Sequence, residues 1–320
     1  MTTRQRKREG FALMAALWLV VLVGVTGYEL SVRARSRRLA VANALETVQA
    51  RAAAEAALET ARAAIEQQLR QPRETRVAAS VVMIDPLSDL AFVRADTFEL
   101  GNARSTALVH DAGSRLQVNR ATEDDIRRFL VALPLDARIA DHLAQSILDW
   151  RDPDDFRRPN GAERDDYLHR GARVLPANAD FRAIDELRDV DGMTADVYAR
   201  IAEYLSVTGS GQINLNSAPR QVLRSLPGIG DEAAGALLQA RQAGRPLQSL
   251  TELSVRLSSA ARQSLLDATA VLMPRVTFEA HEVAVEAFGW VQGSPVRVPA
   301  IALFQRSGDV LTVTTRRVGP

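Results

Sequence analysis

The sequence predicts an α+β fold: a long N-terminal transmembrane and amphipathic helix carries an α/β head, and an all-α segment is inserted into that head. Three observations lead to this prediction. A long apolar run near the N-terminus continues into a stretch of good helix formers. Strand-like alternation occurs before residue 116 and returns after residue 275. The region between, residues 116–273, consists of short helix patterns separated by Gly, Pro and Asp.

The first 30 residues predict a membrane anchor. A basic cluster at residues 4–8 precedes Gly10, and the run that begins at Phe11 has no charged residue until Glu29. A helix of about 20 such residues crosses a hydrocarbon core of roughly 30 Å. A secretory signal peptide would have a shorter apolar region and a cleavage motif soon after it. We therefore predict a transmembrane segment over 11–30.

The junction of Gly10 and Phe11 resembles the leader of type IV pilin-like proteins, and this resemblance implies a leader over 1–10. Such leaders are cut by a prepilin peptidase on the cytoplasmic face, which would leave Phe11 as a methylated N-terminus. A plain N-terminal anchor is the alternative. Charge alone does not set the orientation, because arginines follow the span as well as precede it.

Residues 31–115 are predicted to form the rest of the helix and the first part of the head. Residues 31–69 contain neither Pro nor Gly, and Pro72 ends the run. Two apolar stripes follow at helical spacing. Either one faces neighbouring subunits and the other faces the chain's own sheet, or their displacement has no meaning because alanine is neutral. The first stripe is Val41, Leu45, Val48 and Ala52, and the second is Ala54, Leu58, Ala61, Ile65 and Leu69.

The strands expected for the head come from both ends of the chain. Short apolar runs at 76–84 and 91–98 indicate weak strands, and 106–110 with 115–119 suggest a hairpin about the turn at 111–114. The C-terminal segment 274–320 completes the head. Its alternating runs at 276–288, 296–304 and 310–316 predict strands, the last two joined at a turn over 306–309.

Two segments of the predicted insertion begin alike, at Leu116–Thr122 and Ile213–Pro219. Each places an asparagine before a helix start, and a helix–Gly turn–helix pattern recurs. The stretch Ala218–Gln242 resembles a helix-hairpin-helix motif, which grips DNA phosphates in some proteins. The net charge is −6 over residues 116–204 and +2 over 205–272, so few cations are available for phosphate. We therefore favour a packing role and expect no nucleic-acid partner.

The acidic segment Asp149–Tyr167 contains the candidate metal ligands. Carboxylate oxygens suit calcium, although their spacing is not that of an EF-hand. The alternatives are a solvated loop whose arginines balance the acids and a paired-carboxylate glycosidase, for which no aromatic segment that would stack a sugar is present. The candidate ligands are Asp149, Asp152, Asp154, Asp155, Glu163, Asp165 and Asp166.

Composition excludes other kinds of site. The 320-residue chain has a net charge of +1 and no cysteine, so disulfides and Cys-ligated zinc are absent. Its four histidines are scattered without metal-ligand spacing. We find no positioned nucleophile and base, no phosphate loop and no catalytic metal cluster, and we expect no enzyme activity and no catalytic residue.

These motifs together resemble the type II secretion system protein K family. The resemblance covers nearly the whole chain and includes Ala15, where most pilin-like proteins have Glu. Ile147–Trp150 is part of it, although family members often have Ile where this chain has Arg151. The remaining matching residues and segments are Gly10–Phe11, Asp111–Gly113, Val118–Ala121, Asp152, Asp154–Asp155, Gly161–Glu163, Asp165–Tyr167 and Ile213–Pro219.

The resemblance implies a minor pseudopilin at the tip of the periplasmic pseudopilus, which helps to start its assembly and to export folded proteins. It implies a single-pass protein of the bacterial inner membrane with a periplasmic head and calcium in the inserted segment. Its implied partners are other minor pseudopilins, the major pseudopilin and prepilin peptidase. The alternative function is a membrane-anchored DNA receptor that uses the helix-hairpin-helix.

Overall fold

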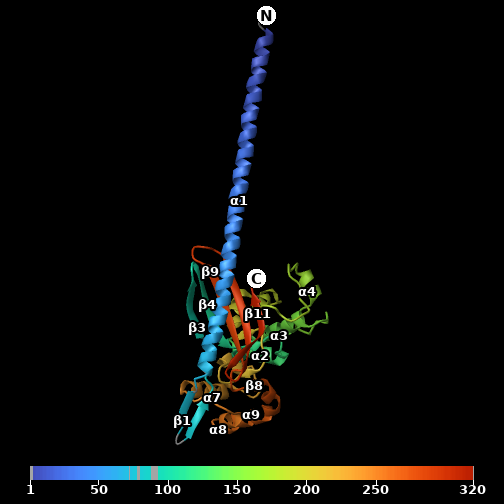
Figure 1. The fold of residues 1–320 in the computed structure, drawn as a ribbon. Helices are drawn as coiled ribbons and strands as arrows, with labels where there is room; N and C mark the ends of the chain where they lie inside the picture. Colours follow the sequence, from blue (N-terminus) through green and yellow to red (C-terminus); the bar gives the residue numbers. More distant parts are fainter. Residues whose placement is uncertain (1–2, 72, 78–79, 88–92, 320) are drawn as a thin grey trace.

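Helix α1 (Thr3–Leu69) is a single helix of 67 residues that projects far beyond the head (Figure 1). The computed structural model describes residues 3–71, 73–77, 80–87 and 93–319. At 1.5 Å per residue the helix is about 100 Å long. Pro72, the predicted helix stop, lies outside the described residues. The prediction of a long N-terminal apolar helix in an α+β chain is confirmed.

The two predicted stripes of α1 have different environments. The side chains of Leu58 and Ile65 are 1% and 4% exposed and pack against the sheet, as do the other members of the second stripe. Leu45 and Val48 of the first stripe are 57% and 64% exposed. The lower part of α1 is therefore half buried by its own head, and the first stripe is open.

A five-stranded antiparallel sheet lies against the lower part of α1, in the order β11-β10-β9-β4-β3. Its apolar face is formed by residues such as Val109, Val285 and Phe304. Gly289 allows the closest approach, since an added Cβ would lie 1.9 Å from the carbonyl oxygen of Ala50 on α1. The strands are β3 (Val93–Leu100), β4 (Ala103–Asp111), β9 (Glu282–Val291), β10 (Arg297–Ser307) and β11 (Val310–Val318).

Side chains of α1 also hold the edge strand β11. The carboxylate of Glu66 accepts a hydrogen bond from the Leu311 backbone N–H at 3.0 Å, and the Arg51 guanidinium donates to the Val318 carbonyl at 2.9 Å. These contacts occupy backbone groups at both ends of an exposed strand edge. A separate hairpin, β1 (Arg73–Val77) with β2 (Ser80–Ile84), follows the helix.

Strands β4 and β9 are neighbours in the sheet although residues 112–281 separate them in sequence. Asp111 pairs with Val283 where the chain leaves and re-enters the sheet. The predicted hairpin between 106–110 and 115–119 is wrong. Residues 112–114 form a 3-10 turn that turns the chain away, and the following strand pairs with residue 205 and its neighbour instead of with β4.

The intervening segment has its own hydrophobic core, which includes Phe129, Trp150 and Leu237. It is mainly helical, but the expectation of an all-α segment needs correction. Two parallel two-residue strand pairs, β5 with β6 and β7 with β8, occur where the chain passes beside its own entry and exit. Its elements are as follows: η1 (Ala112–Ser114), β5 (Leu116–Gln117), α2 (Glu123–Ala132), α3 (Ala137–Arg151), α4 (Arg164–His169), η2 (Ile184–Asp189), α5 (Ala195–Ile201), η3 (Ala202–Tyr204), β6 (Leu205–Ser206), β7 (Ile213–Asn214), α6 (Arg220–Leu223), α7 (Asp231–Gln242), α8 (Leu250–Val255), α9 (Ser259–Leu272), η4 (Met273–Arg275) and β8 (Val276–Thr277).

The two segments that begin alike also fold alike. Asn119 uses its amide to bond both the N–H and the carbonyl of Phe181, at 2.8 and 3.0 Å. Asn216 bonds the same two groups of Leu247, at 3.1 and 2.7 Å. Each asparagine therefore holds a distant loop beside the start of its helix pair.

An arginine completes each of these two units. Arg151, at the end of α3, donates to the carbonyls of Val118 and Ala121. Arg241, in the last turn of α7, donates to the carbonyls at the matching positions, residues 215 and 218. Arg151 therefore belongs to the repeated framework, which accounts for a basic residue directly after Trp150.

A buried polar network joins the inserted segment to the sheet. Asp111, 1% exposed at the end of β4, accepts hydrogen bonds from Asn214 and Ser217, both at 2.6 Å, and from the Gly113 N–H at 2.8 Å. Burial raises the pKa of the Asp111 carboxyl, and these hydrogen bonds oppose the shift.

Candidate cation site in the acidic segment

The acidic segment connects α3 to α4, and aromatic packing fixes both of its ends. Trp150, 2% exposed in the last turn of α3, lies 5.8 Å from the ring of Tyr167 in α4 and stacks at 6.0 Å on Phe181. Asn178 adds a further link, because its N–H bonds the Trp150 carbonyl at 3.0 Å. The loop between the helices therefore starts and ends on a rigid cluster.

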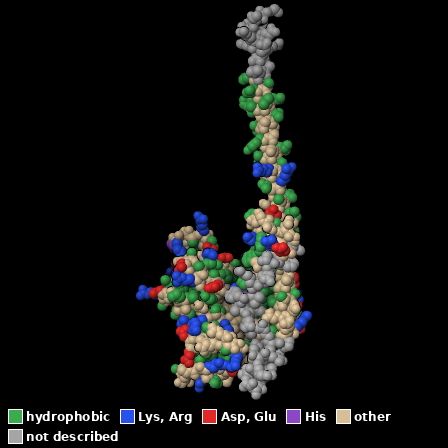
Figure 2. Space-filling view, turned by 90° about the vertical axis from the view of Figure 1, so that its left-hand side faces the viewer, with side chains coloured by type: hydrophobic (Ala, Val, Ile, Leu, Met, Phe, Trp, Pro, Cys, Tyr) green, Lys and Arg blue, Asp and Glu red, His purple; other side chains and the backbone are tan. Residues whose placement is uncertain are grey.

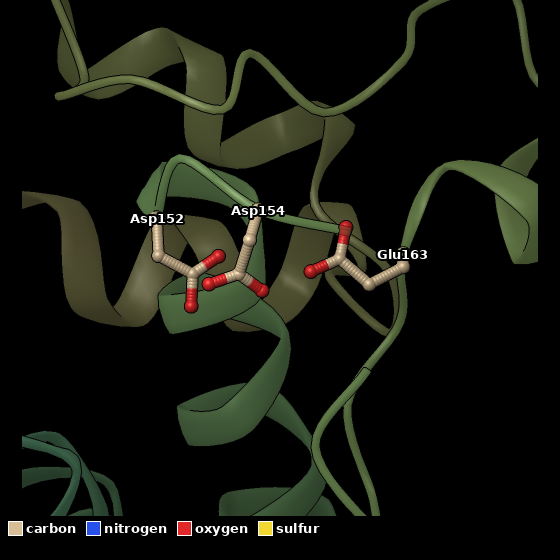
Figure 3. A group of neighbouring side chains, drawn as sticks. All are labelled: Asp152, Asp154 and Glu163. Atoms are coloured by element: carbon tan, nitrogen blue, oxygen red, sulfur yellow. The ribbon is translucent and has the colours of Figure 1, made fainter. Parts of the chain in front are cut away.

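Three carboxylates converge within this loop. Asp152 caps the C-terminus of α3, Asp154 follows it in the loop, and Glu163 precedes the first residue of α4. One oxygen of each lies within 4.8 Å of the others, and the side chains point toward one another (Figure 3). Asp154 is exposed and Glu163 is buried, so the group has one open side and one closed side.

Glu163 is the member of the group whose negative charge is least balanced by neighbouring donors. The residue is 3% exposed, and neither carboxylate oxygen has a hydrogen-bond partner among the described residues. Burial raises its pKa to about 7, and the charges of Asp149, Asp152 and Asp155 add to the shift. One oxygen of Asp152, Oδ1, is also buried without a partner among those residues.

The other predicted ligands lie outside this group of three. Asp149 is fully buried and bonded by Arg158, and Asp166 bonds the Glu163 N–H at 3.0 Å and Arg157 at 3.1 Å. Asp155 accepts from Asn178 at 3.0 Å. Asp155, Asp165 and Asp166 line an adjacent hollow of about 300 Å³ that also reaches Glu163.

The donor set fits a hard divalent cation. All three converging side chains offer oxygen only, and calcium takes six to eight oxygen ligands, with carbonyls and water completing the shell. A buried carboxylate without a partner is costly when ionised, and a cation within the group would remove that cost. Sequence reasoning missed Asn178, which adopts a positive φ of 46° and whose side chain bonds the Asp154 carbonyl at 3.1 Å. The one signal in the sequence was the residue type, because asparagine adopts positive φ angles more often than most residues do.

The stretch that resembles a helix-hairpin-helix forms α6, a turn and α7. Gly228 in the turn has a φ of +73°, and Gly192 in the related turn before α5 has a φ of +78°. A Cβ added to Gly228 would lie 2.6 Å from the Ala268 Cβ and 2.9 Å from the Ser264 carbonyl oxygen. This side of the turn therefore packs on helix α9.

The N-terminal part of α1 is exposed and apolar. Leu17, Trp18 and Leu22 are 62–68% exposed, and the helix from residue 16 is long and apolar enough to cross a membrane. Figure 2 shows hydrophobic side chains around this part of the helix, followed by arginines nearer the head. Gly10, Phe11 and Ala15 lie in the helix, and only their backbone is described.

Comparisons with known proteins identify relatives along the whole chain. A family model for type II secretion system (T2SS) protein K matches residues 98–210. A Klebsiella pneumoniae type II secretion system protein K is 26% identical over 338 aligned positions, which cover 100% of this chain and 98% of the relative. The Dickeya chrysanthemi protein of the same name is 30% identical over 122 residues. That alignment covers 36% of this chain and only 33% of the relative.

A solved structure shares the fold. It is a chain from the GspK-GspI-GspJ complex of the enterotoxigenic Escherichia coli type 2 secretion system. The superposition has a TM-score of 0.61 and 18% sequence identity, and it covers 90% of this chain and 99% of that one. The similarity therefore includes both the head and most of the inserted segment.

Proposed function

We propose that the chain belongs to the type II secretion system protein K family and works as a non-enzymatic minor pseudopilin at the tip of the periplasmic pseudopilus. The observation that carries this proposal is the continuity of α1. Its exposed apolar half suits a bilayer, and its lower half is buried under the sheet of the head. Membrane anchor and head are thus parts of one rigid element, as a filament subunit requires.

The proposed topology places the basic N-terminus in the cytoplasm and the head in the periplasm, with one crossing of the inner membrane. Prepilin peptidase would cleave between Gly10 and Phe11, and Phe11 would then be methylated. The partners would be the other minor pseudopilins and the major pseudopilin. The solved relative was crystallised as a complex with GspI and GspJ, which supports this choice.

A secretion assay tests the proposed role. In a cell that lacks this protein, folded substrates of the same secretion system should accumulate in the periplasm, and the full-length chain should restore export. The chain should also co-purify from membranes with the other minor pseudopilins of that system. Normal export without the protein would contradict the proposal.

The acidic segment would bind calcium in this subunit. Asp152, Asp154 and Glu163 would supply side-chain ligands, and the ion would tie the end of α3 to the start of α4. This part of the proposal is supported by the buried, unpartnered carboxylate of Glu163. The remaining predicted acids would not ligate the ion directly. They would attract it by their negative charge or hold the loop in place through their hydrogen bonds.

Calorimetric titration with calcium tests this site in the full chain, purified in detergent and treated with a chelator. Wild type should bind, and Glu163→Gln and Asp154→Asn should each weaken binding. An Asp196→Asn variant, which changes an exposed acid in α5, should bind as wild type does. Unchanged affinity in both site variants would contradict the assignment of ligands.

We infer that the helix–turn–helix around Gly228 is a packing unit. The turn lies against Ser264 and Ala268 of α9, and Arg220 and Arg224 beside it lie 3.6 and 3.3 Å from Asp231. Both arginines are already paired with Asp231, and the turn is covered by α9. Few cations and backbone N–H groups therefore remain to bind the phosphates of DNA. The DNA-receptor alternative has no support from the family comparisons.

A further inference from the structure

Arg158 is an internal cation beside the proposed calcium site. Its Nη1 donates to Asp149 Oδ1 and to Asp152 Oδ2, both at 2.5 Å. Its Nε lies 4.0 Å from the carboxylate of Glu123. One guanidinium therefore bridges a fully buried carboxylate and a member of the converging group.

The two carboxylates hold Arg158 from different sides. Asp149 is 0% exposed and also accepts the Arg158 backbone N–H at 3.2 Å, so this contact anchors the residue from within. Asp152 is 21% exposed and belongs at the same time to the group with Asp154 and Glu163. Asp152 is thus the only one of these acids, among the described residues, that both contacts Arg158 and belongs to the converging group.

Arg158 and a calcium ion would share the carboxylate of Asp152. Arg158 occupies Oδ2, and Oδ1 has no partner among the described residues, so an ion cannot take both oxygens while Arg158 is bound. The N–H donors of the guanidinium and a calcium ion at 2.3–2.6 Å both bind the lone pairs of carboxylate oxygens, so each contact excludes the other at the same oxygen. Two positive charges placed on the same aspartate also repel each other, and the partly buried position screens that repulsion poorly.

We propose that Arg158 competes with a bound divalent cation for Asp152 and thereby lowers the calcium affinity of the site. This inference rests on the calcium site proposed above. Without metal, Arg158 links the end of α3 to the loop through Asp149 and Asp152. When calcium binds, Asp152 turns to the ion and Arg158 stays on Asp149. The arginine therefore sets the calcium concentration at which the loop changes partners.

Arg157 provides a matched control. It lies next to Arg158 in the same segment, and its guanidinium is 3.1 Å from Asp166, which is not in the converging group. Arg157→Gln and Arg158→Gln each remove one positive charge near the site. Only Arg158→Gln frees Asp152.

The test is calorimetric titration of calcium chloride into the full chain in detergent, after chelator treatment. Arg158→Gln should lower the calcium Kd on the order of tenfold, and Arg157→Gln should change it by less than about twofold. Equal effects of the two variants would overturn the proposal, because they would indicate general electrostatics. An unchanged or higher Kd for Arg158→Gln would overturn it as well.

Two further arms keep the outcome decisive. If wild type binds no calcium but Arg158→Gln does, competition by Arg158 is supported in its strongest form. If neither binds, the calcium site itself fails and the competition fails with it. Should Arg158→Gln not fold, the double variant Asp149→Asn/Arg158→Gln is compared with the single variant Asp149→Asn. The proposal then requires that the double variant bind calcium more tightly than the single variant.

Discussion

At the scale of single residues, this fold depends on a few positions where size or charge has no substitute. Gly289 lies where strand β9 meets α1, and the helix backbone fills the space of a side chain. Glu163 is a buried carboxylate among other acids. The sequence revealed neither: a glycine in a strand predicts a close approach without naming the partner, and the burial of one acid depends on how the loop between α3 and α4 packs.

Gly289→Ala should destabilise the head by about 2–3 kcal/mol or more, because overpacking at a backbone contact forces α1 off the sheet. The measurement is urea unfolding of the full chain in detergent. Gly230→Ala is the control, since nothing lies within 4 Å of the added Cβ there, and its cost should stay below about 1 kcal/mol. Equal losses at both positions would show that the helix–sheet contact is not tight.

Glu163 should make stability depend on pH when metal is absent. Its pKa is raised to about 7 from an ordinary 4.5, so the folded chain binds this proton more tightly than the unfolded chain does. Protonated Glu163 therefore stabilises the folded chain fully below about pH 4.5, and this contribution to the unfolding free energy is lost as the pH rises through 7. With a chelator present, Glu163→Gln should exceed wild type in unfolding free energy by about 2 kcal/mol at pH 8. The difference should shrink at pH 5, and a difference that did not change with pH would contradict the buried, charged carboxyl.

At the scale of elements, α1 serves two purposes along its length. Its length was predictable because no Pro or Gly interrupts residues 31–69. The two stripes were predictable from their spacing, but which of them faces the sheet was not, and the packing of Leu58 and Ile65 shows that it is the second. The place of β5 was not predictable, because a strong turn signal at 111–114 fits both a hairpin and an exit from the sheet.

The open stripe of α1 should contact a neighbouring subunit. The chain has no cysteine, so Leu45→Cys introduces a unique thiol on that stripe. In membranes with the assembled pseudopilus it should form disulfide-linked products with cysteines placed on the helices of the other minor pseudopilins. Asn43→Cys, exposed on the opposite face of the helix, should cross-link much less. Equal cross-linking at both positions would argue against a defined helix–helix contact.

At the scale of the whole molecule, the head and the inserted segment are joined at the two points where the chain leaves and re-enters the sheet. The return of strand-like alternation after residue 275 predicted that both ends of the chain contribute to one sheet, and β4 does pair with β9. The acidic segment was predictable as a site by its residue types. Which three acids converge was not, because it depends on the course of the loop: Arg158 bonds Asp149, which lies outside the group, as well as Asp152, which belongs to it.

Asp111 should control how firmly these two parts are joined. Asp111→Ala would leave the buried amide of Asn214 and the hydroxyl of Ser217 without their acceptor, at a cost of about 2–3 kcal/mol in unfolding free energy. Asp196→Ala, an exposed acid, should change it by less than about 0.5 kcal/mol. Thermal or urea unfolding compares the two, and similar small losses would show that the network does not hold the insertion in place.

The most direct measurement of the central claim is the N-terminal sequence of the membrane-bound protein, made with and without prepilin peptidase. A pilin-like subunit must begin at a methylated Phe11 when the peptidase is present and at the intact leader when it is absent. An unprocessed leader under both conditions would contradict the assignment of this chain as a pseudopilin.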